Sequence, residues 1–218
     1  MLKALFYPGD VPFDSLFVPA IYHEIHYDGI YLDAMNVLEK EKKDPVIVDI
    51  GANIGITVQY FRNYAKKVYA VEPSTEHFAA LKKNKEFNKW DNVVLDKCAI
   101  ADKDGEMELR LCESNRTSHS LMFPAKKEEL VEKVPTKKLT TFFKDNNIKH
   151  VDFMKFDVEG AENLILPSDD FAEASKIIDI IMIEFHFNNF PEHVNRLIKL
   201  GYQARRYNSS AIVVGFNK

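Results

Sequence analysis

The feature that most constrains the fold is an alternation of short apolar runs with stretches of helical periodicity. Five runs rich in β-branched residues are predicted as strands: residues 46–50, 68–71, 93–95, 151–156 and 178–185. After the first run, Val58, Phe61 and Ala65 recur at helical spacing, and Phe78, Leu81 and Lys85 mark one face of a second helix. Alternating strands and helices predict a parallel sheet with helices on both faces, the doubly wound α/β class.

The last part of the chain predicts an antiparallel addition to this sheet. A helix over 191–200 has Pro191 in its first turn and Gly201 just past its end. Residues 202–207 and 211–216 are then predicted as two strands of a hairpin, with the turn at 208–210. A shorter helix is expected from near Glu159 to Pro167, because proline ends a helix.

Two segments do not follow the alternation and divide the chain into an N-terminal part, 1–44, and a main domain, 45–218. The first is rich in aromatic residues and predicts a helix, either as a cap over the sheet or as an extension along one sheet edge. The second, residues 102–141, predicts a hairpin around Asp102-Lys103-Asp104-Gly105. The loop over 113–135 is then expected at the surface or as a lid.

Charge and composition exclude several classes of protein. The 218 residues carry a net charge of −4, so the chain is not a general polyanion binder, although Lys82, Lys83, Lys85 and Lys89 make one helix basic. No apolar run approaches the roughly 20 residues that span a bilayer. Pro8, Gly9 and Asp10 come too early for a signal peptide. Cys98 and Cys112 lack metal-site spacing, so we expect reduced thiols, a cytoplasmic location, no membrane partner and no zinc site.

A glycine loop follows the first predicted strand directly. Gly51 and Gly55, within Asp49-Ile50-Gly51-Ala52-Asn53-Ile54-Gly55, allow a tight turn and a close approach of backbone to a ligand. The GxxxG spacing departs from the dinucleotide fingerprint GxGxxG. Glu72 ends the second strand, 21 residues after Gly51, where an acidic residue accepts hydrogen bonds from both ribose hydroxyls of a nucleoside cofactor. The structural alternatives are an ordinary strand–helix turn and a carboxylate near a helix N-terminus.

Three segments, VIVDIGANIG, VYAVEPS and VDFMKFDVEGAE, together resemble the FkbM family of S-adenosylmethionine-dependent methyltransferases. The resemblance covers roughly residues 46 to 190, and DVEGAE is its most specific piece. It implies a Rossmann-like, seven-stranded class I methyltransferase fold, S-adenosyl-L-methionine as cofactor, and usually O-methylation of a small molecule or sugar. It also implies that Asp49, Gly51, Asn53 and Gly55 hold the amino-acid end of the cofactor. Glu72 would hold the ribose, and Cys98 and Ala99 would flank the adenine.

Polar residues also end the fourth and fifth predicted strands. Asp157 would stabilise the sulfonium, orient the acceptor or act as general base, or else cap the following helix. Alternation puts Glu184 and His186 on one side of the fifth strand, opposite Phe185. An unperturbed histidine titrates near neutrality, so His186 is predicted to accept the proton, with a purely structural histidine as the equal alternative. Asp157, Glu184 and His186 have no metal-ligand spacing, and no metal is predicted.

The sequence therefore predicts a methyltransferase that acts on the oxygen of a small molecule or glycan. No NPPY-type segment, which grips a planar amine, follows the fourth strand, and this favours oxygen over an exocyclic nitrogen. Three alternatives remain open. They are a tRNA-modifying methyltransferase, although nucleic acid is not the expected partner, a nicotinamide-dependent oxidoreductase, and a non-catalytic nucleoside-binding module. No feature predicts the oligomeric state.

Overall fold

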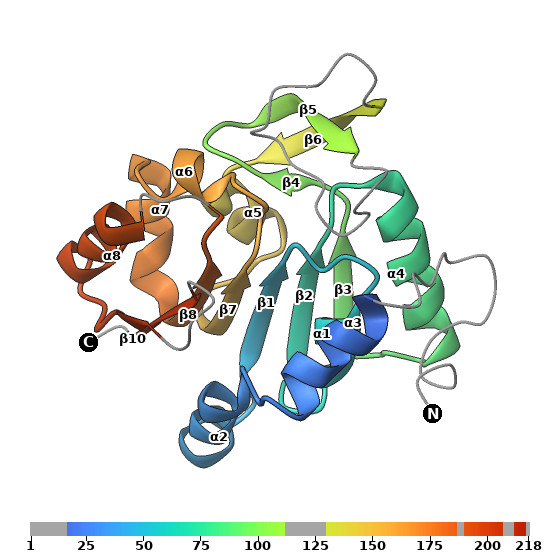
Figure 1. Cartoon of the computed structure of the whole chain (residues 1–218), viewed down its shortest axis with the longest axis horizontal. Coiled ribbons are helices and arrows are strands. Elements are labelled where there is room, and N and C mark those ends of the chain that lie inside the picture. Colours follow the sequence, from blue (N-terminus) through green and yellow to red (C-terminus); the bar gives the residue numbers. More distant parts are fainter. Residues whose placement is uncertain (1–16, 112–129, 187–189, 207–211, 217–218) are drawn as a thin grey trace.

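The computed structural model describes residues 17–111, 130–186, 190–206 and 212–216. It contains two sheets flanked by helices (Figure 1). The helices are α1 Phe17–His26, α2 Leu32–Glu41, α3 Ile56–Phe61, α4 Thr75–Phe87, α5 Leu139–Asp145, α6 Glu162–Ile165, α7 Asp169–Ala174 and α8 Phe190–Lys199. The strands are β1 Val46–Ile50, β2 Lys67–Val71, β3 Val93–Asp96, β4 Ala99–Ile100, β5 Gly105–Leu111, β6 Leu130–Lys137, β7 Val151–Phe156, β8 Ile178–Glu184, β9 Arg205–Arg206 and β10 Ile212–Phe216.

The larger sheet has seven strands in the order β3-β2-β1-β7-β8-β10-β9. The first five of these are parallel to one another, whereas β10 runs antiparallel to both β8 and β9. This confirms the doubly wound, mostly parallel sheet and the closing antiparallel pair. The strand β9 is shorter than the predicted 202–207, and the predicted turn at 208–210 lies outside the described residues.

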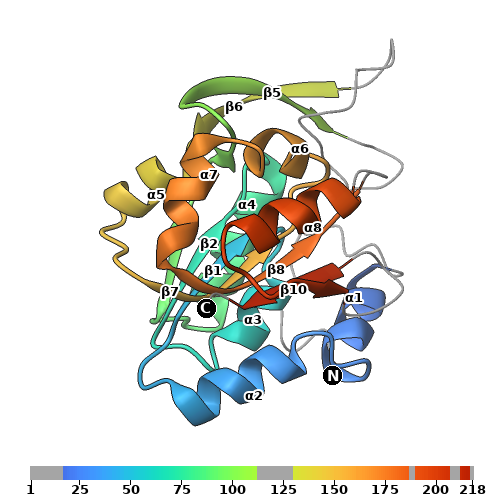
Figure 2. The same ribbon diagram turned by 90° about the vertical axis from the view of Figure 1, so that its left-hand side faces the viewer.

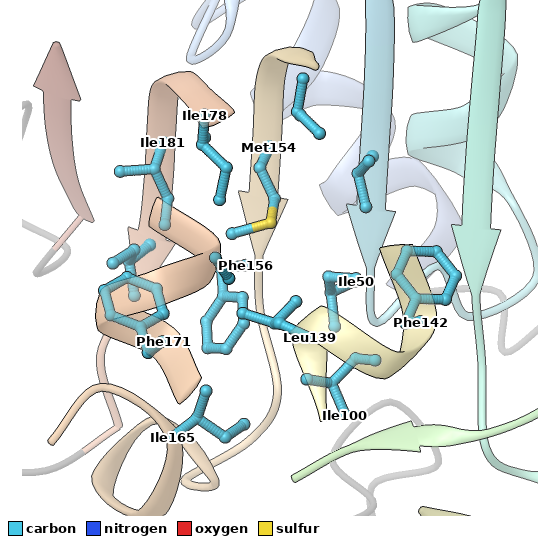
Figure 3. Close-up of a cluster of buried hydrophobic side chains, with 14 of the residues drawn as sticks. Ile50, Ile100, Leu139, Phe142, Met154, Phe156, Ile165, Phe171, Ile178 and Ile181 are labelled. Carbon is cyan, nitrogen blue, oxygen red and sulfur yellow. The ribbon is translucent and has the colours of Figure 1, made fainter. Parts of the chain in front are cut away.

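The strands are buried on both faces because apolar residues follow one another along them. In β1, Ile47 packs into a cluster with residues of α1 to α4, whereas Val48 packs into a cluster with residues of α5 to α8. The two groups of helices therefore cover opposite faces (Figure 2). Figure 3 shows the second cluster, where Phe156 of β7 and Leu139 of α5 lie side by side.

The N-terminal segment lies on a face of the large sheet. Met35 and Leu38 of α2 are fully buried in the cluster that contains Ile47 and Phe153, and Ile25 of α1 belongs to the same cluster. These two helices therefore share a core with the strands, and the role of residues 1–44 as a cap or an extension stays a prediction. Residues 1–16 of the segment are not described.

The predicted hairpin around 102–105 is wrong. The strands on either side of this turn, β4 and β5, do not pair with each other, because β6 lies between them in a second, three-stranded sheet. β6 replaces the last part of the loop predicted over 113–135, and the remainder, 113–129, lies outside the described residues. The second sheet follows the end of β3 directly, so it lies beyond the carboxyl ends of the large sheet (Figure 1).

The helix predicted from near Glu159 begins later, at Glu162. Glu159 and Gly160 have left-handed backbone conformations, with φ of 50° and 103°, which a right-handed helix does not accommodate. Asp157 is therefore not the cap of this helix, whose N-cap residue is Ala161. Within the described part of the chain, every helix is too short or too polar to traverse a lipid bilayer.

Candidate active site

Four strands of the large sheet end at the same level. In the register, Ile50 of β1 lies beside Val71 of β2 on one side and Phe156 of β7 on the other, and Phe156 lies beside Ile183 of β8. The residues that come next in each strand or loop are Gly51, Glu72, Asp157 and Glu184. The structure thus brings the predicted site residues from four strands to one sheet edge, where open α/β sheets bind ligands.

The two glycines of the loop after β1 serve different needs. Gly51 has φ of 79°, and a Cβ there would lie 1.8 Å from the backbone oxygen of Asp157. The loop after β1 therefore packs directly against the turn after β7. Gly55 has φ of 95° and is buried, and a Cβ there would lie 2.6 Å from Leu81 and 3.1 Å from Trp90. Its role in the structure is to let α3 and its loop pack against α4.

Glu72 is buried and holds the glycine loop. Its Oε2 accepts a hydrogen bond from the backbone N–H of Asn53 at 2.9 Å, and its Oε1 accepts one from the N–H of Ser74 at 2.9 Å. The Asn53 side chain is engaged locally, because its Oδ1 accepts from the N–H of Ile54 at 2.7 Å. Each Glu72 oxygen accepts one hydrogen bond from the backbone, so each retains a lone pair for a ligand hydroxyl.

Cys98 and Ala99, the two residues predicted to flank the adenine, pack into different clusters. Cys98 is fully buried in the core cluster shared with Ile100 and Leu139, and burial raises the pKa of its thiol. Ala99 packs instead with Leu109 and Val134 of the second sheet. Both side chains are buried, so a ligand at the sheet edge could reach only the backbone of this segment.

Lys155 is a buried cation between two carboxylates, and the sequence analysis did not single it out. Its Nζ lies 3.2 Å from Oδ2 of Asp157 and 3.4 Å from Oδ1 of Asp49, and it donates a hydrogen bond of 2.9 Å to the carbonyl of Gly51. Burial lowers the pKa of the ammonium, but the charges of Asp157 and Asp49 outweigh that effect and raise it. Lys155 therefore stays charged and joins the glycine loop to Asp157.

Asp49 and Asp157, the two carboxylates beside Lys155, differ in their exposure to solvent. Asp49 is fully buried, and its Oδ2 accepts a hydrogen bond from the hydroxyl of Thr57. Asp157 is half-buried, and its Oδ1 is a buried atom without a hydrogen-bond partner among the described residues. Asp49 thus supports the loop from beneath, whereas the Asp157 side chain is partly exposed at the edge, with its Oδ1 3.8 Å from Nε2 of His186.

His186 is surrounded by carboxylates. The buried Glu162 accepts hydrogen bonds at its Oε1 from the backbone N–H of His186 at 2.8 Å and from the ring Nδ1 at 3.1 Å. The other ring nitrogen, Nε2, lies 3.2 Å from Oε2 of Glu159 and 3.8 Å from Oδ1 of Asp157. Burial lowers the pKa of the imidazole, but the bond to Glu162 and these charges outweigh it and raise the pKa to about 9.

This pKa conflicts with the predicted role of His186 as proton acceptor. At neutral pH the ring carries both protons, so it donates and does not accept. Its position at the end of β8, beside Asp157, is as the alternation of the strand predicts. The predicted role took an unperturbed histidine as its premise, whereas Glu162 and Glu159 stabilise the charged form of His186.

Two glutamates at this edge titrate near neutrality. Burial, followed by the charge of Asp157, raises the pKa of Glu159 to about 7. Glu184 is exposed at the end of β8, yet desolvation by the surrounding chain and the charge of Asp157 raise its pKa to about 7 as well. Glu24 of α1 also has a raised pKa, first from desolvation and then from Asp28 and Asp157, which places this helix within electrostatic reach of the site.

The grouping of Asp157, Glu159 and His186 has the composition of a metal site. One ligand atom from each lies within 4.8 Å of the others. The proton that His186 retains on Nε2 already interacts with both carboxylates, and we assign no metal to them. The second such group, His150, Asp152 and Asp179, lies at the other end of β7 and β8, where the ammonium of Lys42 bridges its two carboxylates.

Sequence reasoning missed Lys155 and underrated Glu162. A lysine between Met154 and Phe156 in an otherwise apolar strand was the available signal for Lys155, because an unpaired lysine is rarely buried. Glu162 lies in the first turn of α6, where an acidic residue ordinarily interacts with the helix dipole, but the structure shows it as a buried link between two segments. Its partner on the other segment, His186, is 24 residues away, so no local pattern indicated the contact.

Comparison with known proteins gives one consistent result. Residues 49–204 match the model of the methyltransferase FkbM domain. "Methyltransferase 1" of Beauveria bassiana is 25% identical over 181 residues, covering 74% of this chain and 72% of that protein. "Methyltransferase sdnD" of Sordaria araneosa is 28% identical over 182 residues, covering 69% of this chain and 68% of its own length.

Solved structures with a similar fold include two methyltransferases. Magnesium protoporphyrin IX methyltransferase from Synechocystis, solved with bound S-adenosylmethionine, has a TM-score of 0.55 at 10% identity, over 99% of this chain and 89% of that one. An rRNA methylase from Streptococcus thermophilus has a TM-score of 0.51 at 11% identity, over 87% of this chain and 96% of that one. At such identities the likeness concerns the fold alone.

Proposed function

The chain belongs to the FkbM methyltransferase family, and from that membership we propose that it transfers a methyl group to a hydroxyl oxygen of a small molecule or sugar. It is an S-adenosylmethionine-dependent methyltransferase. The acceptor class and the roles of individual residues are the proposal. The observation that carries it is the group of carboxylates at the ends of β7 and β8, arranged around one imidazolium.

The residues at the ends of β1 and β2 fit the cofactor. The two Glu72 oxygens can each accept one ribose hydroxyl in addition to their backbone donors. Gly51 brings backbone to the edge without a side chain, and Asn53 follows it in the same loop. We propose that these three residues contact the cofactor directly, that Asp49 and Gly55 support the loop, and that the backbone at Cys98 and Ala99 borders the adenine.

The residues at the ends of β7 and β8 fit the transfer end of the site. When bound, the cofactor supplies an electrophilic methyl group beside a positively charged sulfur. Asp157, with Oδ2 paired to Lys155 and Oδ1 3.8 Å from Nε2 of His186, would orient the acceptor hydroxyl and stabilise the positive charge. His186 would hold the carboxylates in place as a cation. Glu184 would add negative charge at the end of β8.

Oxygen is favoured over nitrogen as the methyl acceptor by the need for a base. A neutral hydroxyl must lose its proton as it is methylated, and carboxylates with pKa values near 7 are suited to receive a proton at neutral pH. The turn after β7 has the sequence Asp157-Val158-Glu159-Gly160 and supplies carboxylates at that place. These two features support O-methylation as the proposed reaction.

The proposal is tested by methyl transfer from radiolabelled S-adenosylmethionine to a panel of acceptors. The panel contains simple sugars, phenols and aliphatic alcohols, together with primary amines and bulk tRNA. We expect labelled product from at least one hydroxyl acceptor and a loss of roughly 10²-fold in turnover in Asp157→Asn. Transfer to amines or tRNA alone would contradict O-methylation. Cofactor binding with no transfer to any member would favour a non-catalytic nucleoside-binding module.

A further inference from the structure

We propose that Glu159 is the group that takes the proton from the acceptor hydroxyl, and that His186 and Glu162 are the positioning residues that hold it. The inference rests on the proposed function and adds the identity of the proton acceptor. Glu159 belongs to the turn after β7 and was not among the site residues that the sequence predicted. Three observations carry the inference: the backbone of the turn, the contacts of Glu162, and the comparison of Glu159 with its neighbours.

The backbone at Glu159 is held in a conformation that side chains rarely adopt. Its φ is 50°, and Gly160 follows with φ of 103°. Such conformations persist where surrounding contacts enforce them, and they are frequent at functional sites. Here the enforcing contact is the hydrogen bond of 2.8 Å from the N–H of Gly160 to Oε2 of Glu162. The turn therefore presents the Glu159 side chain at the edge and does not continue into α6.

Glu162 joins this turn to the end of β8. While its Oε2 holds Gly160, its Oε1 accepts from the backbone N–H and from Nδ1 of His186. With Nδ1 fixed, Nε2 of the ring points to Oε2 of Glu159 at 3.2 Å. Glu162 is only 1% exposed, so these bonds are shielded from water. A single buried carboxylate thus sets the position of both Glu159 and its charged partner.

The neighbouring groups are less suited to accept the proton. Both oxygens of Asp157 face a cation, because Oδ2 lies 3.2 Å from Nζ of Lys155 and Oδ1 lies 3.8 Å from Nε2 of His186, and His186 is itself protonated. Glu184 is exposed and is the one competitor whose pKa is similar. The charged groups that act on Glu159 are Asp157 of its own turn, His186 and Glu184 from the end of β8, and Lys155 of β7. Together with burial, which is the largest cause, these charges give Glu159 a pKa of about 7.

The proton transfer balances without any additional reactant. The O–H bond of the acceptor breaks and its proton moves to a carboxylate oxygen of Glu159. The electron pair left on the acceptor oxygen forms the bond to the methyl carbon, and the pair of the broken carbon–sulfur bond stays on sulfur. Glu159 returns its proton to water before the next turnover, which a pKa near 7 permits at neutral pH.

The test uses two cofactor analogues, so that no acceptor is needed. Sinefungin carries an ammonium-bearing carbon where the methylsulfonium group would be, whereas S-adenosylhomocysteine has neither methyl nor charge there. Calorimetry measures both affinities at about pH 6 and about pH 8, on either side of the pKa of about 7. In the unmodified protein we expect the preference for sinefungin to be larger at the higher pH, where Glu159 is ionised. Glu159→Gln should remove this pH dependence and lower the preference roughly tenfold.

The controls separate the possible failures. Glu192→Gln removes an exposed carboxylate of α8 and should behave as the unmodified protein. S-adenosylhomocysteine should bind Glu159→Gln with unchanged affinity. The inference is overturned if Glu159→Gln keeps the preference for sinefungin over S-adenosylhomocysteine. It is also overturned if Glu184→Gln loses that preference while Glu159→Gln keeps it. Failure of the unmodified protein to bind either analogue counts against the proposed function itself.

The positioning role of Glu162 has a spectroscopic test. In Glu162→Gln we expect NMR titration to show the His186 pKa falling from about 9 toward its ordinary value. The sinefungin preference should shrink in the same variant, while the affinity for S-adenosylhomocysteine is retained. If Glu162→Gln folds and keeps both the His186 titration and the preference of the unmodified protein, Glu162 has only a structural role. If it does not fold, the Glu159→Gln comparison still decides the central point.

Discussion

Lys155 shows how one buried side chain can hold two functional segments together. It contacts the carbonyl of Gly51, the carboxylate of Asp49 beneath the glycine loop, and Asp157 just after the end of β7. An unpaired charge in this position would be strongly unfavourable, and the two carboxylates offset that cost. The charged residues of the site therefore hold one another in position: Lys155 is neutralised by Asp49 and Asp157, and through them it fixes the glycine loop and the turn after β7.

Glu72 gives the first prediction. Replacing Glu72 with alanine removes the proposed acceptor of the ribose hydroxyls, and each hydrogen bond to a charged group is worth about 1.5–3 kcal/mol. We expect calorimetry to show S-adenosylhomocysteine binding weakened by at least roughly tenfold. The exposed Glu76, on the first turn of α4, supplies the control Glu76→Ala, which should bind as the unmodified protein does. Equal affinity in a folded Glu72→Ala variant would limit Glu72 to holding Asn53 and Ser74.

His186 predicts how stability depends on pH. Its pKa is about 9 in the folded chain, above its ordinary value of 6.5, so folding favours the protonated ring. The stabilisation is complete below the ordinary value and is lost as the pH rises through 9. Urea denaturation should therefore show a decrease in the free energy of unfolding between about pH 7.5 and about pH 9.5. This decrease should be smaller in His186→Gln, and an identical slope in both proteins would show that the ring is not held as a cation.

At the scale of elements, the site depends on the contact between the β1–α3 loop and the turn after β7. Gly51→Ala places a Cβ 1.8 Å from the backbone oxygen of Asp157, in a left-handed conformation. We expect the free energy of unfolding to fall by about 4 kcal/mol or more, or folding to be lost. Gly105→Ala is the matched control, because φ there is 145° and nothing lies within 4 Å. It should cost about 1–3 kcal/mol from backbone strain alone, and equal losses in both variants would refute the loop contact.

The elements that the sequence predicted are those with strong local patterns. The strands β1, β2, β7 and β8 were predicted because each is an apolar run. Their parallel direction was predicted because helical stretches alternate with them along the chain. In contrast, β6 has few buried residues and contains Pro135, so its sequence LVEKVPTK resembles a polar loop. The short helix α7 was missed for a similar reason, because six residues carry little periodicity.

The positions of the site residues could be predicted from the sequence, but their charge states could not. The glycine loop, Glu72 and Asp157 follow strands directly, so their place at one edge could be predicted from topology. The charge states could not, because they depend on contacts across the fold, such as that of Glu162 with His186. A residue's pKa reflects neighbours that the chain brings together only when it folds.

For the whole molecule, we expect the distribution of charge to disfavour nucleic acid at the ends of β7 and β8. The net charge is −4, and the residues at the edge include Asp157, Glu159 and Glu184. The exposed lysines of α4, Lys82 and Lys83, lie on a different element. We expect filter binding to detect no tRNA complex at physiological salt. Binding that weakens steeply as salt rises, and that is lost in Lys82→Ala/Lys83→Ala, would contradict this and support a tRNA substrate.

The central claim is that the ends of β1, β2, β7 and β8 bind S-adenosylmethionine. Titration of the unmodified protein with S-adenosylhomocysteine in a calorimeter, with NAD in a parallel titration, tests it most directly. We expect saturable binding of S-adenosylhomocysteine with one site per chain and no heat of binding from NAD. We also expect a higher melting temperature with S-adenosylhomocysteine, because a ligand that binds only the folded state stabilises it. Binding of NAD without binding of S-adenosylhomocysteine would contradict the account.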